Sequence, residues 1–368
     1  MKRKKSFLLY ILIAILVFSF TGCKKSEQKL TAENEIEKGF DIKAAENVIT
    51  SYMQYLMQED YENANKLYST KLSKNSPKIQ EQPLKIKGFN ISEINEVGRS
   101  GLFKIKVTRV NMNQSFTSLD EYSIKVEKEG VDYKLSDVNN VVDREAFPKK
   151  NQIRMKSKNN ADTNLVIDTN GIPSYIFSKD DKTNTNKLPV PKKEFGAMIF
   201  SYSGYNLAIS TYNQDAFAGI VKIDESMAVQ GEDQNEQQQP SDGGGSQDQG
   251  EMNIKEKPVG KEIVSLDLIK NSKIEYMTFS QDEKFILVQY KKNNKSRCIR
   301  VYNTEGGNII PYVFEQNYPI DKVDIVFSSF DKEILNFEVL PKEASDKSIG
   351  KYIGRWQIDL KEFKVKKV

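Results

Sequence analysis

The sequence predicts an α+β region over residues 41–146, followed by an all-β region over residues 151–368. Two patterns support this division. Apolar residues recur at helical spacing over the first stretch and then alternate with polar residues, as they do in half-buried strands. In the second region, a strand that ends in Phe-Ser and is followed by a short polar turn and a second strand occurs three times, which indicates an internal structural repeat.

The chain begins with a stretch that is typical of a targeting segment. A basic start is followed by an unbroken apolar run over residues 7–20 and then by Thr21-Gly22-Cys23. This is the layout of a secretory signal peptide, here residues 1–22. The end of the run resembles the lipobox of bacterial lipoproteins, with Phe20 where the family has Leu. The resemblance implies that the thiol of Cys23 receives a diacylglyceryl group, which would hold the protein at the extracytoplasmic face of the cell membrane.

Two other interpretations of this segment remain open. The apolar run could be a membrane-spanning helix, but its 14 residues fall short of the roughly 20 that are needed. Cys23 could also be incidental to an ordinary cleaved signal, although no Ala-x-Ala-like site is present. Loss of the leader would remove four basic residues from a chain of net charge +4. A near-neutral mature chain gives no support to nucleic-acid binding, which requires a clustered basic face.

Residues 23–40 are polar, and we expect them to form a flexible, lipidated tether. Beyond them, two helical patterns are separated by a break at residues 58–60, where Asp60 is suited to cap the second helix. After Pro83 the pattern alternates, and Glu129-Gly130 suits a hairpin turn. Four strands are therefore expected, at residues 84–89, 102–107, 122–126 and 133–135.

Two helices followed by an antiparallel meander resemble the cystatin-like NTF2 family. Residues 47–56 and 60–64 are typical of such domains in lipoproteins of Gram-positive, clostridial-type bacteria. The family's cone holds a pocket between helix and sheet, which some members use for catalysis with Asp/His pairs. This chain contains no histidine. We therefore expect a packed or ligand-free cone that serves as a spacer or docking unit.

The repeat in the all-β region is marked by Phe-Ser pairs that start at residues 200, 279 and 327. The first gap of 79 residues contains a polar segment, residues 227–258, which we expect to be a disordered insert. Subtracting these 32 residues from 79 leaves 47, close to the second gap of 48. This period, with several strands per unit, is typical of propellers.

The turn at residues 279–284 is similar to that of TolB-type and WD40-like blades, with Gln281 and Glu283 in place of Pro and Gly. The resemblance implies a small propeller-like domain of about four units, the first near residues 165–177. A β-sandwich built from the same hairpins is the alternative.

The composition excludes several kinds of site. Without histidine, neither Ser-His-Asp nor Cys-His catalysis nor His-ligated zinc is available. If Cys23 is lipidated, Cys298 has no disulfide partner, and its alternating surroundings predict a buried strand position. The glycine run at residues 243–245 lacks the features of a phosphate-binding loop. Residues 168–171 fit a hairpin turn better than a calcium loop. We predict no catalytic residue, cofactor or metal site.

The sequence thus predicts a non-enzymatic lipoprotein that acts as a binding, scaffolding or signalling-accessory component of the cell envelope. Its partner would be an envelope protein or a glycan, because repeated hairpins present many loops on a rigid frame. One alternative is an envelope hydrolase that uses carboxylates alone, as glycosidases can. Another is a solute-binding lipoprotein, although the two-lobed α/β pattern of such proteins is not seen.

Overall fold

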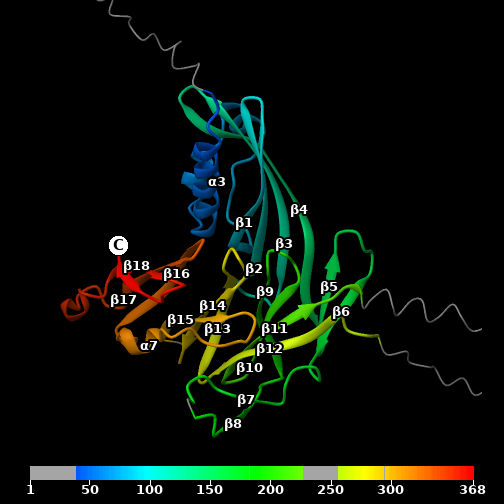
Figure 1. Cartoon of the computed structure of the whole chain (residues 1–368), viewed down its shortest axis with the longest axis vertical. Coiled ribbons are helices and arrows are strands. Elements are labelled where there is room, and N and C mark those ends of the chain that lie inside the picture. Colours follow the sequence, from blue (N-terminus) through cyan, green and yellow to red (C-terminus); the bar gives the residue numbers. More distant parts are fainter. Residues whose placement is uncertain (1–38, 182, 227–255, 294) are drawn as a thin grey trace, which may run out of the picture. The chain divides into compact units, whose positions relative to one another are not determined.

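The computed structural model describes residues 39–181, 183–226, 256–293 and 295–368 (Figure 1). Residues 41–368 form one compact unit. The predicted signal peptide, almost all of the predicted tether and most of the predicted insert at 227–258 lie outside the described residues. Within the described ranges, no helix is both long and apolar enough to cross a membrane.

Three helices open the compact unit: α3 (Ile42–Met57), α4 (Tyr61–Lys66) and α5 (Thr70–Asn75). Asp41 caps α3 by accepting hydrogen bonds from the backbone N–H groups of Lys43 and Ala44 at 2.9 and 3.1 Å. The predicted cap at Asp60 is confirmed, because its carboxylate accepts the Asn63 N–H at 3.1 Å. Helix α5 was not predicted from the sequence.

The helices are followed by an antiparallel sheet, here called the first sheet, whose strands neighbour each other in chain order. Its strands are β1 (Leu84–Val97), β2 (Ser100–Asn111), β3 (Thr117–Glu129), β4 (Asp132–Lys149), β5 (Gln152–Ser157) and β6 (Thr163–Asp168). Helix α3 contacts β1 and β4, and Figure 1 shows it alongside the long strands. The four predicted strands and the turn after Glu129 are therefore confirmed, with the strands longer than expected.

The boundary predicted between residues 146 and 151 falls inside this sheet. Strand β4 runs on to Lys149, and a two-residue turn pairs Lys149 directly with Gln152. Strands β5 and β6 thus extend the first sheet, and they do not join the repeats that follow. Pro148, which falls between the two predicted regions, lies within β4 opposite Ile153.

Within the described residues, the rest of the chain forms three further antiparallel sheets and one ribbon, each made of strands consecutive in the chain. The ribbon is β7 (Tyr175–Phe177) with β8 (Lys187–Pro189). The second sheet contains β9 (Glu194–Phe200), β10 (Asn206–Tyr212), β11 (Ala216–Ile223) and β12 (Gly260–Ile269). The third contains β13 (Ser272–Phe279), β14 (Phe285–Lys292) and β15 (Ser296–Asn303). The fourth contains β16 (Val323–Asp331), β17 (Ile334–Pro341), β18 (Gly354–Asp359) and β19 (Val365–Lys367). Short helices α7 (Phe314–Asn317) and η2 (Lys347–Ile349) lie in the connections.

The first two predicted Phe-Ser units have the same hydrogen bonding. The N–H of Ser201 donates to the Asn206 carbonyl, and that of Ser280 donates to the Phe285 carbonyl, both at 2.8 Å. Each serine hydroxyl accepts a bond back from the same partner's N–H, at 3.3 and 3.0 Å. The hairpin repeat is therefore confirmed for these two units.

The third unit differs from the prediction. Ser328 does not end a strand, because it occupies a register shift between Phe327 and Ser329 in the middle of β16. The hairpin turns three residues later, between Asp331 and Ile334. The unit expected near residues 165–177 is also wrong in the described structure, since β6 pairs with β5 and β7 pairs with β8.

The predicted insert joins two paired strands. Ile223 of β11 is the register partner of Gly260 of β12. One apolar core is shared by the second, third and fourth sheets. Another core joins the first and second sheets. The described structure is thus mostly β, with one helical layer on the first sheet.

Candidate functional site

The sequence proposed a single site residue, Cys23, which lies outside the described residues. The other cysteine, Cys298, is fully buried on β15, as predicted. Burial raises the pKa of its thiol to about 12. A thiol in this environment is a packing group and a poor nucleophile.

A cavity of about 610 Å³ lies between the helices, the segment over residues 76–82 and the first sheet. We call it the cup. Its lining includes Tyr52, Leu56, Tyr61, Tyr68, Leu72, Ile79, Ile86, Arg109, Tyr122, Val138 and Asn140. Of the two expectations for this region, a packed cone is therefore wrong, and a cone with an open pocket fits the structure. Its volume is within the range of small-molecule sites.

The strand register explains how polar side chains reach the cup. Tyr122 on β3 is the register partner of both Ile105 on β2 and Asn140 on β4. Arg109 lies four residues along β2 from Ile105 without an intervening shift, so it shares the same face. Three neighbouring strands thus present one cation, one phenol and one amide on the side of the sheet that lines the cup.

The cation is held by a buried carboxylate. Arg109 Nη2 lies 2.6 Å from Asp120 Oδ2, and the Asp120 side chain is fully withdrawn from solvent. The Ser118 hydroxyl donates to Asp120 Oδ1 at 2.8 Å. Burial raises the pKa of Asp120, and the charge of Arg109 opposes that rise. The carboxylate therefore orients Arg109, whose remaining N–H groups have no other acceptor than Ser118 in the described structure.

The aromatic wall of the cup carries hydroxyl groups. The hydroxyls of Tyr52 and Tyr68 lie 3.4 Å apart. Burial raises the pKa of both phenols and of Tyr122, so all three stay protonated at neutral pH. Within the described residues the Tyr122 hydroxyl has no protein hydrogen-bond partner. The cup thus combines apolar walls with a few convergent donors, which is the usual composition of a binding pocket.

Sequence reasoning did not identify these residues. The predicted strand on β2 ended at Val107, two residues before Arg109, so the arginine was not assigned to a sheet face. Tyr122 was placed correctly on a strand, but its cross-strand neighbours depend on register. The alternation of apolar and polar residues on β2 could have been followed past Val107, and that would have placed Arg109 on the same sheet face as Ile105.

No protein-family model matches the chain, and no curated protein sequence matches it. Solved structures that resemble it include a mutant of puromycin hydrolase in complex with PGG, at 5% identity and a TM-score of 0.30. That match covers 76% of this chain and 46% of the hydrolase, less than half of its length.

Another similar structure is Sqt1 of Chaetomium thermophilum, at 10% identity and a TM-score of 0.26, covering 73% of this chain and 78% of Sqt1. The β-propeller domain of Cps50 (Swd1) from Myceliophteria thermophila matches at 9% identity and a TM-score of 0.24, covering 68% and 96%. These TM-scores are too low for the likenesses to support an argument about activity.

Proposed function

We propose that the protein is a membrane-anchored, extracytoplasmic lipoprotein that binds a ligand without transforming it, as a binding, scaffolding or signalling-accessory component of the cell envelope. The observation that carries the binding part is the cup, where Arg109 and Tyr122 present donors that have unused hydrogen-bonding capacity. The anchoring part rests on Cys23 and the segment before it.

The arrangement of acids in the cup favours binding over hydrolysis. A hydrolase that uses carboxylates alone needs two acids facing one substrate position. Asp120 is occupied by Arg109 and Ser118 and is fully buried. Asp120 lies behind Arg109 and does not line the cup, and Glu81, which does line it, is ion-paired with Lys85 at 2.8 Å. Neither acid is placed to attack or to protonate a ligand.

The proposal includes an NTF2-like domain followed by a propeller-like domain. The helices and β1–β4 would form an NTF2-like domain, and the cup lies between helix and sheet, where that resemblance implies a pocket. The second, third and fourth sheets would be propeller-like, since each is an antiparallel meander and two share the Phe-Ser turn. A Gram-positive bacterial source would fit the same lipoprotein resemblance.

The anchor is tested by expressing the full chain in a bacterium with and without Cys23→Ala. We expect the wild type in the membrane fraction, with metabolically supplied palmitate attached to it. The Cys23→Ala chain should lose the label and leave the membrane. Retention of Cys23→Ala in the membrane would contradict the anchoring proposal and would not bear on ligand binding in the cup.

The cup is tested by cross-linking in intact cells, with recovery of the bound molecule from wild type, Tyr122→Phe and Tyr175→Phe. Tyr175 is an exposed residue of β7, outside the cup, and serves as the matched control. We expect Tyr122→Phe alone to reduce recovery. Equal recovery from all three chains would contradict a binding role for the cup.

A further inference from the structure

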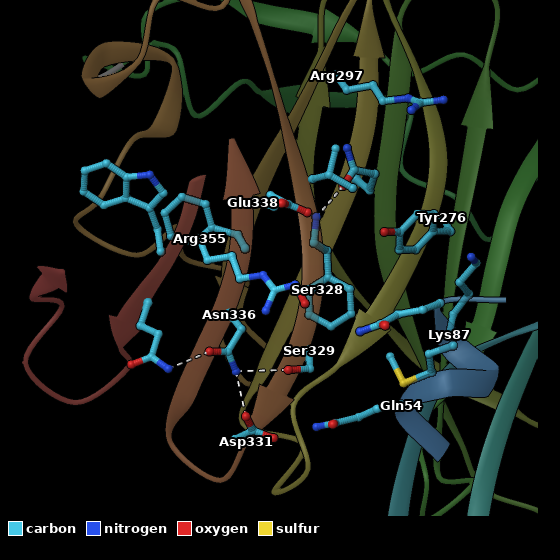
Figure 2. Close-up of a pocket in the computed structure, with 18 of the residues that line it drawn as sticks. Gln54, Lys87, Tyr276, Arg297, Ser328, Ser329, Asp331, Asn336, Glu338 and Arg355 are labelled. Carbon is cyan, nitrogen blue, oxygen red and sulfur yellow. Dashed lines mark hydrogen bonds between the residues drawn. The ribbon is translucent and has the colours of Figure 1, made fainter. Parts of the chain in front are cut away.

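A second, larger cavity of about 750 Å³ lies where the end of α3 and strand β1 meet the third and fourth sheets (Figure 2). We call it the cleft. It is lined by segments that are far apart in the chain, including residues of α3, β1, β13 and β16–β18. Its lining differs from that of the cup, because charged and amide side chains predominate over aromatic ones.

The cleft contains a largely buried lysine side chain whose ammonium group has no hydrogen-bond acceptor among the described residues. The side chain of Lys87 is only 14% exposed, and its Nζ lies 4.0 Å from Glu59 Oε1. The other oxygen of Glu59 is taken by Lys85 Nζ at 2.7 Å. Lys87 Nζ also lies 5.0 Å from the centroid of the Tyr276 ring. A partly desolvated ammonium that makes no hydrogen bond is costly unless something else satisfies it.

Other donors around the cleft are also unused. In the described part of the chain, the hydroxyls of Tyr276 and Ser328 and the side-chain amide of Gln54 make no hydrogen bond to protein. Figure 2 shows all three lining the same cavity as Lys87. By contrast, Asn336 is fully engaged, donating to Ser329 and Asp331 at 3.0 and 2.7 Å. The Asn336 amide is therefore unavailable to a ligand, whereas the hydroxyls and the amide of the other three side chains are available.

The charges around the cleft limit the charge of a ligand. Arg297 is paired with Glu275 at 3.3 Å, whereas Arg355 lies opposite Glu338 in the strand register and makes no ion pair in the described structure. For Lys87, the nearest acid is Glu59, which already pairs with Lys85 at a shorter distance. The lining holds four acids (Glu59, Glu275, Asp331 and Glu338) and three cations (Lys87, Arg297 and Arg355), so a ligand with a single negative charge suits it better than a doubly charged phosphate.

We propose that the cleft binds a sugar acid, free or within a glycan, with its carboxylate on Lys87 and its hydroxyls on Tyr276, Ser328 and Gln54. Amide and hydroxyl side chains can each donate and accept, which suits the hydroxyls of a pyranose ring. A volume of about 750 Å³ accommodates a ligand of one or two rings. The inference goes beyond the proposed function, because it concerns a different cavity and stands whether or not Cys23 is lipidated.

The test is a calorimetric titration of the full-length protein in detergent with D-glucuronate and with D-glucose. The two sugars differ in the carboxylate, so contact with Lys87 predicts that glucuronate binds at least about tenfold more tightly. Lys87→Met should reduce glucuronate affinity by about tenfold or more. Lys106→Met is the matched control, since Lys106 is a partly buried lysine of β2 outside the cleft, and it should bind as the wild type does.

Tyr276→Phe provides a second variant that keeps the ring and removes only the hydroxyl. We expect it to weaken glucuronate several-fold with an unchanged urea midpoint. Equal affinity for the two sugars, no heat with either, or wild-type affinity in Lys87→Met would each overturn the proposal. None of these outcomes bears on the anchor or on the cup.

Discussion

Arg300 Nη1 on β15 lies 2.7 Å from Asp267 Oδ2 on β12, and their side chains are only 4% and 0% exposed. The pair joins the third sheet to the second through the core. The Tyr302 hydroxyl donates to the same Asp267 oxygen at 2.8 Å, and Glu315 Oε1 lies 2.7 Å from Arg300. A buried ion pair of this kind makes the fold sensitive to substitution, because removal of one partner leaves the other charged and desolvated.

We therefore expect Arg300→Met to lower the free energy of unfolding by about 3–5 kcal/mol, measured by urea denaturation. The matched control is Arg297→Met on the same strand, because Arg297 is 47% exposed in a surface pair with Glu275. That change should cost less than about 1 kcal/mol. Similar losses of stability in the two variants would show that the buried pair contributes no more to stability than the surface pair does.

Gly88 of β1 lies close to Thr278 on β13 and to Tyr202 in the turn after β9. A Cβ atom at this position would clash with the Tyr202 hydroxyl oxygen and would meet the Thr278 hydroxyl oxygen at 2.9 Å. Both hydroxyls are committed, to the carbonyls of Phe279 and Lys87 at 3.1 and 2.9 Å. Overpacking here should force these bonds apart.

We predict that Gly88→Ala destabilises the protein by about 1–3 kcal/mol, measured as a shift of the urea midpoint. Tyr202→Phe in the Gly88→Ala background removes the nearest atom and should recover part of the loss. Gly39→Ala, where no atom lies within 4 Å of the new Cβ, should be close to neutral. A neutral Gly88→Ala would mean that β1 can shift away at little cost.

The sequence predicted those features that local chemistry determines. Asp60 was recognisable as a cap because its acceptor reaches an N–H three residues away. The turns after Ser201 and Ser280 were recognisable because both ends of each hairpin lie within six residues. Ser328 misled the prediction, since a serine in a bulge and a serine at a turn look alike without the partner strand.

The features that were missed depend on distant partners. Strand β12 pairs with β11 across the interval that contains the predicted insert, and no local pattern reveals that pairing. The boundary expected between residues 146 and 151 was likewise misplaced, because β4 continues past Pro148. The cup and the cleft are spaces left between elements, so their existence depends on packing. Arg109, Tyr122 and Lys87 became candidates only once the register and the burial were known.

The thiol of Cys298 offers a test of the packing of the third sheet. Burial raises its pKa to about 12, so the thiolate is scarce near neutral pH. In a Cys23→Ala chain, which has one thiol, we expect alkylation at about pH 8 to be at least about a thousand times slower than for an exposed cysteine. Labelling should become fast in concentrated urea. Fast labelling of the folded chain would contradict the buried position.

Lys87 provides a test that links stability to pH. Burial lowers the pKa of Lys87 from 10.5, while Glu59 and Glu275 raise it and Lys85 lowers it further. Between the folded pKa and 10.5 the unfolded chain binds more protons than the folded chain, so stability rises with pH across that window. Below it, at neutral pH, the penalty of burying the charge is fully present.

We therefore predict that Lys87→Met is more stable than the wild type at about pH 7, and that the difference shrinks as the pH approaches 10.5. Urea midpoints at several pH values would measure this, with Lys106→Met as the control. Lys106 pairs with Glu121 at 3.0 Å, so its loss should not stabilise the protein. A Lys87→Met chain that is less stable than the wild type at neutral pH would mean that Lys87 is a structural cation. A Lys87→Met chain that is more stable than the wild type would show that the buried charge costs stability, as expected of a residue kept for ligand binding.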